Sequence, residues 1–92
     1  MKYTITFTGS EPKPGSLFCF NFEANGEPIA VVTKIASVPG EPVAQLNDWV
    51  ECAEAWVRHR IARERYRPER GDQIVLPHEM FREWKKTRRF PR

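Results

Sequence analysis

The sequence predicts an α+β fold: a three- to four-stranded antiparallel sheet, one long helix packed on it and a short C-terminal helix. Three observations predict this class. Apolar and polar residues alternate near the N-terminus, two β-rich runs flank an Asn-Gly pair, and apolar residues recur at helical spacing in the middle of the chain. A chain of 92 residues has room for one hydrophobic core, so we expect residues 1–92 to form a single domain.

The N-terminal segment predicts a half-buried strand over residues 2–8. Tyr3, Ile5 and Phe7 fall on one face, and lysine or threonine occupies the other. The next residues, 9–15, read GSEPKPG, and their prolines and glycines predict a loop that ends the strand.

A hairpin follows, formed by residues 17–24 and 27–36 around Asn25 and Gly26. Asn-Gly suits a two-residue type I′ turn because both central positions need a positive φ angle. Such a turn fixes the pairing, so that the numbers of paired residues sum to 51 and the three phenylalanines of the first run share the core face. The opposite face is largely uncharged and is available for a cover or a partner: Leu17, Cys19, Asn21, Glu23, Ala30 and Val32.

The middle of the chain predicts a long helix, from about residue 43 or 48 to about residue 66. Asp48 and Glu51 fit a capping arrangement at its start, and Glu54 and Arg58 form a favourable i,i+4 pair. One apolar stripe runs along it: Leu46, Trp49, Val50, Ala53, Trp56, Val57 and Ile61.

Two short elements complete the prediction. Residues 73–76 suggest a fourth strand, and Pro77 opens a short helix with Met80, Phe81 and Trp84 as its apolar face. We expect Trp84 to lie in the core, and residues 82–92 to form a basic, partly frayed C-terminal segment.

The charges divide sharply along the chain. Residues 1–57 carry three basic and seven acidic side chains, a net −4, whereas residues 58–92 carry twelve basic and five acidic ones, a net +7. Such asymmetry indicates contact with nucleic acid or another acidic surface.

The candidate contact residues form two basic clusters. Phosphate binding by such side chains releases counterions, and the aromatic rings of Trp84 and Phe90 between them suggest stacking on unpaired bases. Arg60 falls within the angular range of the apolar stripe, so we expect it to extend from the core edge. The alternative is that these charges only solvate a helix face and a tail. The candidates are Arg58, Arg60, Arg63, Arg65, Arg67 and Arg70, then Arg82, Lys85, Lys86, Arg88 and Arg89.

Catalytic and metal-binding patterns are not found in the sequence. It has no glycine-rich phosphate loop, no zinc-ligand spacing and no H-E-x-x-H motif. Cys19 and Cys52 predict free, partly buried thiols, and His78 beside Glu79 predicts a solvated helix start. A Cys52–His59 nucleophile would lack an orienting group. We therefore expect a protein that is not an enzyme and uses no cofactor, metal or small-molecule substrate.

The hydropathy pattern indicates no membrane association. No apolar run approaches the roughly 18 residues of a membrane span, and MKYTITFTGS alternates instead of forming a signal peptide. We expect a cytoplasmic protein.

The chain resembles phage-encoded anti-CRISPR proteins directed at type I systems, type I-F included. The resemblance rests on the compact length, on the FCFNFEANGEPIAVV hairpin feeding the NDWVECAEAWVRHRIARERY helix, and on the lack of a catalytic motif. Those proteins share no common motif, so no individual residue takes a role from it. It implies a binding inhibitor that docks on a host Cas protein–guide RNA complex and blocks target DNA binding, touching guide RNA or acidic protein.

Two alternatives stay open. The chain could be a small phage regulator that binds nucleic acid alone, although it lacks the motifs of RNA-recognition, KH and helix-turn-helix modules. It could also be a structural module that forms homodimers through the apolar hairpin face.

Overall fold

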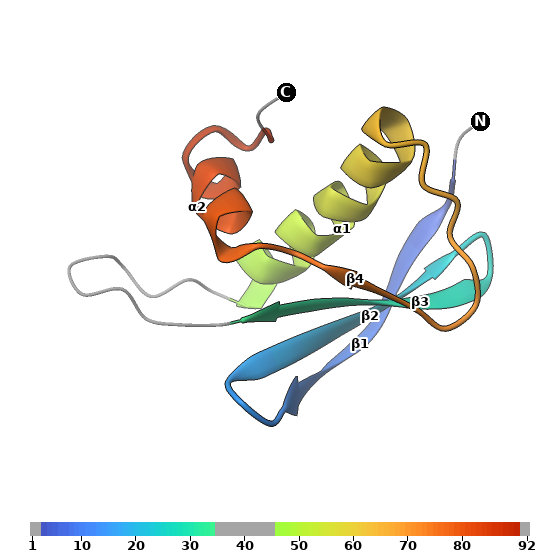
Figure 1. Cartoon of the computed structure of the whole chain (residues 1–92), viewed down its shortest axis with the longest axis horizontal. Helices are drawn as coiled ribbons and strands as arrows, with labels where there is room; N and C mark the ends of the chain where they lie inside the picture. The colour runs from blue at the N-terminus through green and yellow to red at the C-terminus, as the bar shows by residue number, and fades with distance from the viewer. Residues whose placement is uncertain (1–2, 35–45, 91–92) are drawn as a thin grey trace.

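The computed structural model describes residues 3–34 and 46–90 and confirms the α+β class. Both helices lie on one face of a four-stranded sheet, so the molecule has two layers with the core between them (Figure 1). In chain order the elements are β1 (Ile5–Lys13), β2 (Leu17–Ala24), β3 (Glu27–Lys34), α1 (Leu46–Arg63), β4 (Asp72–Val75) and α2 (His78–Thr87).

The central hairpin forms as the sequence predicts. Every β2–β3 pair from Leu17–Lys34 to Ala24–Glu27 sums to 51, and Asn25 and Gly26 take φ angles of 51° and 85°. The phenylalanine face is the core face, since the side chains of Phe20, Phe22 and Val31 are almost completely buried. The last two residues of the predicted run, 35–36, lie outside the described residues.

Strand β1 differs from the prediction, because it continues through the expected loop as far as Lys13. The register to β2 shifts between Phe7 and Gly9, which marks a β-bulge, and Phe7 is 39% exposed instead of buried. Pro12 is tolerated because β1 lies at the edge of the sheet, where one side of the strand needs no ladder partner. The prolines and glycine therefore predict the edge position of this segment better than its secondary structure.

Strand β4 corrects the prediction of an all-antiparallel sheet. It pairs with β3 in parallel, from Ile29–Asp72 to Val32–Val75, and its bounds are 72–75 instead of 73–76. The chain crosses the sheet as α1 between β3 and β4 and returns in the same direction, which is how parallel neighbours are connected.

Helix α1 is shorter than predicted, since it ends at Arg63, and the predicted start at residues 43–45 lies outside the described residues. Leu46 is 52% exposed, so the apolar stripe begins one turn later than expected. Asp48 lies within the first turn instead of capping it, and its carboxylate accepts hydrogen bonds from Arg88. The buried face adds a cysteine to the predicted stripe: Trp49, Cys52, Ala53, Trp56 and Val57.

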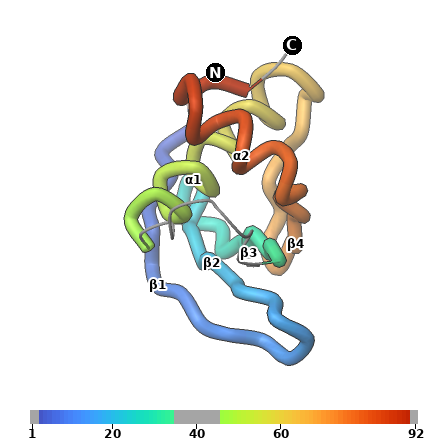
Figure 2. The backbone as a smooth tube through the Cα atoms, turned by 90° about the vertical axis from the view of Figure 1, so that its left-hand side faces the viewer, coloured from blue at the N-terminus to red at the C-terminus, as the bar shows by residue number. Residues whose placement is uncertain are grey.

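Helix α2 packs beside α1 on the same side of the sheet (Figure 2). The rings of Trp49 and Phe81 stack with centroids 3.5 Å apart and an interplanar angle of 7°. Trp84 is only 5% exposed, which confirms its place in the core. Residues 82–87, predicted to be partly frayed, are helical, while the last two residues of the chain lie outside the described part.

Candidate functional site

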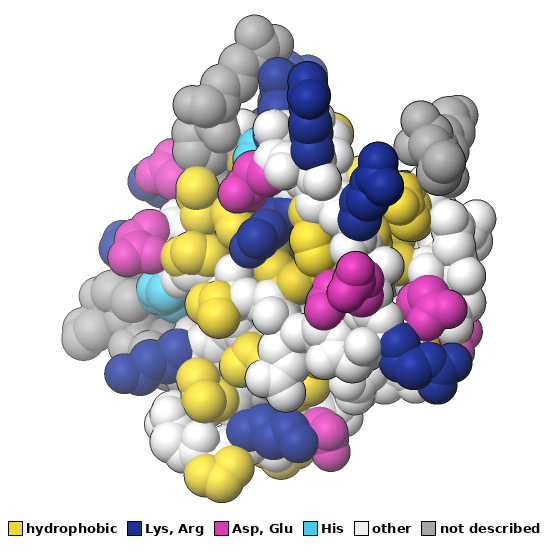
Figure 3. Space-filling view, turned by 45° about the vertical axis from the view of Figure 1, so that its right-hand side comes forward, with side chains coloured by type: hydrophobic (Ala, Val, Ile, Leu, Met, Phe, Trp, Pro, Cys, Tyr) yellow, Lys and Arg dark blue, Asp and Glu magenta, His cyan; other side chains and the backbone are white. Residues whose placement is uncertain are grey.

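The predicted basic residues come from the end of α1, the connector to β4, and α2 with the residues after it. They do not form one continuous positive surface. Figure 3 shows Asp and Glu side chains beside several of the Lys and Arg side chains on one face of the molecule. The acidic first half of the chain folds against the basic second half, so the candidates divide into paired and unpaired groups.

Two arginines are engaged by acids near them in space. Arg58 lies 3.5 Å from Glu54, as its i,i+4 spacing predicts, and also donates to the carbonyl oxygen of Tyr3 at 3.2 Å. Arg70 lies 3.5 Å from Glu27 on β3. Exposed pairs of this kind add about 1 kcal/mol or less to stability, but they offset charge that a partner would otherwise feel.

Arg60 extends from the core edge, as predicted. Its side chain is 31% exposed, its Nε lies 3.6 Å from an Oε2 oxygen of Glu64, and its guanidinium carbon lies 5.5 Å from the ring centroid of Tyr66. Because the pair and the ring both hold this side chain against the protein, Arg60 contributes less to an open surface than its neighbours.

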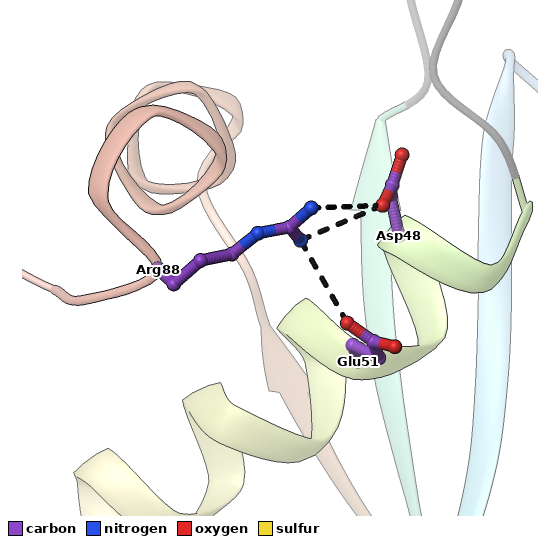
Figure 4. Close-up of polar contacts among 3 residues, drawn as sticks. All are labelled: Asp48, Glu51 and Arg88. Atoms are coloured by element: carbon purple, nitrogen blue, oxygen red, sulfur yellow. Dashed lines mark hydrogen bonds and ion pairs between the residues drawn. The ribbon is translucent and has the colours of Figure 1, made fainter.

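Arg88 connects the two helices (Figure 4). Its Nη1 and Nη2 donate to Oδ1 of Asp48 at 3.5 and 3.4 Å, and Nη1 lies 3.7 Å from Oε2 of Glu51. The guanidinium carbon lies 4.4 Å from the ring centroid of Trp84.

Two other cations of α2 also have partners. Lys86 lies 3.9 Å from the carboxylate of Glu83, and Arg82 has an interaction partner as well. Within the second predicted cluster, Arg82, Lys86 and Arg88 therefore interact with other residues of the protein itself.

Three exposed arginines remain close together in sequence, and we call Arg63, Arg65 and Arg67 the arginine cluster. Within residues 3–34 and 46–90 they form no ion pair. The same holds, in the described part of the chain, for Lys85 and Arg89. The structure thus reduces eleven candidates to five cations without an acidic partner among the described residues.

The arginine cluster stands on a fixed backbone. Arg65 takes a left-handed conformation with φ of 55°, which ends α1, and the Tyr66 N–H donates back to the carbonyl of Arg60 at 3.1 Å. Further on, Asp72 accepts hydrogen bonds from the Tyr66 hydroxyl at 2.6 Å and from the Glu69 N–H at 2.9 Å. The connector is therefore anchored on both sides of Arg67.

These two hydrogen bonds shift the acidity of their partners. The Tyr66 hydroxyl, followed by the Glu69 N–H, holds the pKa of Asp72 below its ordinary value, because both donate to the ionised form. Burial and then the hydrogen bond to Asp72 raise the pKa of Tyr66. At neutral pH the pair is a carboxylate with a protonated phenol.

An aromatic group lies next to the arginine cluster. The rings of Trp56 and His59 stack with centroids 5.5 Å apart, and the ring of Phe90 lies 5.1 Å from Trp56 and 5.3 Å from His59. Since Arg63 follows His59 by four residues, the two share one side of α1. From the sequence, Trp84 and Phe90 were the rings expected among the charges. The spacing of four residues between His59 and Arg63 is the sequence feature that could have identified His59 as well.

The two cysteines are free, as predicted, but they are fully instead of partly buried. Burial raises the pKa of Cys52 to about 12 and also raises the pKa of Cys19, so both are neutral thiols at pH 7. Among the described residues, no group of three or more His, Cys, Asp or Glu side chains is placed to hold a metal ion. No helix in the described ranges is long and apolar enough to cross a membrane.

No family model, curated protein or solved structure matches this chain. Its function must therefore be argued from its own residues, and the arginine cluster with its neighbouring rings is the arrangement that the structure offers.

Proposed function

We propose that this protein is a non-catalytic binding protein that engages a phosphate-bearing partner through the arginine cluster. One observation carries the proposal: three exposed guanidinium groups stand within five residues and have no acidic partner in the described part of the chain, whereas Arg58, Arg70 and Arg88 do. A guanidinium group offers a planar fork of donors that matches phosphate, and it stays charged at every physiological pH.

In its most specific form, the proposal is an inhibitor of an RNA-guided bacterial defence complex, acting in the host cytoplasm. The small chain with no catalytic motif and the resemblance to anti-CRISPR proteins support this form. Guide RNA phosphates, or an acidic patch on a Cas subunit, would receive the arginine cluster, and the bound protein would exclude target DNA. An inhibitor that acts by occupying the DNA-binding site needs affinity and the right position, and it needs no catalytic residue.

The test compares two triple variants of equal charge. Arg63→Gln with Arg65→Gln and Arg67→Gln removes the arginine cluster. Lys13→Gln with Lys34→Gln and Arg70→Gln removes three cations elsewhere, two of which are paired with glutamates. Purified type I surveillance complexes are passed over the immobilised wild type and both variants.

We expect the wild type and the control variant to retain a complex and to block its target DNA, and the cluster variant to lose both. Equal losses in the two variants would show that only net charge matters. If no complex is retained, a labelled RNA or DNA that the wild type shifts would identify a nucleic-acid-binding regulator acting alone. Retention of neither partner ends the proposal.

A second candidate function, self-association, is favoured by the sheet face opposite the helices. Val75 is 64% exposed and Leu17 38% exposed, and Val75 pairs with the partly buried Val32. Cys19 continues this row on β2 but is only 4% exposed, so the face expected to be available is not open at that residue. We expect Val75→Glu to dissociate any dimer in sedimentation equilibrium. A wild-type protein that is monomeric at tens of micromolar would remove this candidate.

A further inference from the structure

We propose that the rings of His59 and Phe90 stack on unpaired nucleotide bases, so that the partner presents single-stranded nucleic acid at the arginine cluster. This inference rests on the proposed function, because it specifies the form of the phosphate-bearing partner. It adds a source of selectivity that the arginines lack, since guanidinium groups bind the phosphates of single strands and duplexes alike.

The ring arrangement forms a platform with a rigid base. Trp56 is only 6% exposed and is fixed in turn, because its Nε1 donates to the carbonyl oxygen of Val75 at 2.9 Å. His59 stacks on it at an interplanar angle of 13°, and Phe90 meets both rings edge-on or tilted. His59 and Phe90 are themselves only partly buried, unlike Trp56.

Two cations are close to the platform residues along the chain. Arg63 lies one helical turn beyond His59, and Arg89 adjoins Phe90 in the chain. Neither forms an ion pair with another described residue. Aromatic rings beside unpaired arginines are the combination by which proteins bind single strands: the rings take base faces and the cations take the backbone.

A duplex does not fit this arrangement equally well. Its bases are stacked on one another, so only phosphates and groove edges are open to a flat ring. Trp84, the ring that the sequence placed among the charges, is sealed in the core and covered by Arg88, so it offers no free face. Tyr66 lies within the arginine cluster, but the guanidinium group of Arg60 lies over its ring, 5.5 Å from the centroid. We therefore propose His59 and Phe90 as the stacking rings.

The experiment separates stacking from packing. Phe90 packs against the core, so Phe90→Leu keeps an apolar side chain there but removes the flat ring, and Phe90→Trp restores a ring. Phe7→Leu is the matched control, because it makes the same change at a partly exposed ring on β1. Each variant is titrated by fluorescence anisotropy against labelled single-stranded RNA, single-stranded DNA and duplex DNA with equal numbers of phosphates at one salt concentration.

We expect the wild type to bind a single strand about tenfold more tightly than the duplex, in line with the loss of a stacked base. Phe90→Leu should lose that margin without changing duplex affinity, Phe90→Trp should regain it, and Phe7→Leu should leave it intact. The comparison of RNA with DNA assigns the strand type.

Equal affinity for single strand and duplex, unchanged in Phe90→Leu, overturns the inference but leaves the proposed function standing. Binding to an acidic protein surface with no affinity for any nucleic acid also overturns it. Loss of all partners overturns the proposed function itself. If near-UV circular dichroism shows that Phe90→Leu loosens the tail, His59→Leu and His59→Tyr repeat the comparison on α1, where the second variant should restore binding.

Discussion

Arg65 combines an unfavourable backbone with a place in the arginine cluster. Its φ of 55° is the left-handed conformation that glycine adopts readily at helix ends. A side chain with a Cβ atom costs about 1 kcal/mol or more there relative to glycine. Under the proposed function, the phosphate contact of the Arg65 side chain offsets this backbone cost.

We predict that Arg65→Gly raises the free energy of unfolding by up to about 1 kcal/mol while it weakens binding to the phosphate-bearing partner. Urea denaturation and anisotropy measure the two effects separately. Arg88→Gly is the control, since Arg88 has φ of 60° but also holds Asp48 and Glu51, so its gain should be offset by lost contacts. Weaker binding together with lower stability in Arg65→Gly would contradict this account.

The hydrogen bond between Tyr66 and Asp72 predicts a pH window of stability. Asp72 has a lowered pKa in the folded state, so its contribution is present above its unfolded pKa of about 4 and is lost as pH falls further. Tyr66 has a raised pKa, so its contribution is present below its unfolded value of about 10 and is lost as pH rises beyond it.

We therefore expect Tyr66→Phe to lower the free energy of unfolding most between about pH 5 and 9, with a difference that shrinks at both extremes. Denaturation with urea at a series of pH values measures it, and Tyr3→Phe removes a phenol elsewhere as the control. A difference that is the same at pH 3 and pH 7 would show that the hydrogen bond does not couple to ionisation.

At the scale of elements, the contact between α1 and α2 has an apolar part and a charged part. The apolar part is the stacked pair of Trp49 and Phe81, where Phe81 is 4% exposed. The charged part is the contact of Arg88 with Asp48 and Glu51, in which the arginine side chain is 54% exposed. Burial decides which part matters more for stability.

We predict that Phe81→Ala lowers the free energy of unfolding by about 3–5 kcal/mol, because it leaves a cavity between the helices. Arg88→Gln should lower it by only about 1 kcal/mol, since water screens an exposed pair. Equilibrium unfolding followed by tryptophan fluorescence compares the two. A larger loss in Arg88→Gln would mean that the charged contact, and not the core, orients α2.

The elements that the sequence predicted well are those determined by local chemistry. Asn25 and Gly26 set the turn and with it the whole β2–β3 register, and helical spacing set the buried face of α1. Whether β4 runs parallel or antiparallel to β3 depends on the path that the chain takes through α1. The four residues of the strand itself do not encode that direction. The bulge after Phe7 is likewise a matter of how β1 meets β2. Alternation placed Phe7 on the correct face, since it pairs with Phe22 and their ring centroids lie 5.5 Å apart, but it did not show that the edge position leaves this ring 39% exposed.

The candidate site was only partly predictable for a related reason. Pairing of Arg58 with Glu54 follows from helical spacing, but Arg70 meets Glu27 and Arg88 meets Asp48 across long stretches of chain. A count of charges along the sequence includes all of these arginines equally. Folding removes some from the available surface and leaves the arginine cluster, a distinction that requires the tertiary structure.

In the whole molecule, a few specific cations, and not the net charge of +3, are proposed to carry binding. The number of phosphates neutralised can be measured from the slope of log K against log salt. Each phosphate contact makes this slope more negative, by about 0.9 on duplex DNA and by about 0.7 on a single strand. Three arginines acting together correspond to a slope of about −2 to −3.

The most direct test is the salt dependence of binding to one labelled nucleic acid, measured for the wild type, the Arg63/Arg65/Arg67→Gln variant and the Lys13/Lys34/Arg70→Gln control. We predict that the wild type and the control share one slope, and that the slope of the cluster variant is smaller in magnitude by about 2 to 3, because three phosphate contacts are lost. The same reduction in both triple variants, or a wild-type slope that the cluster variant leaves unchanged, would contradict the account.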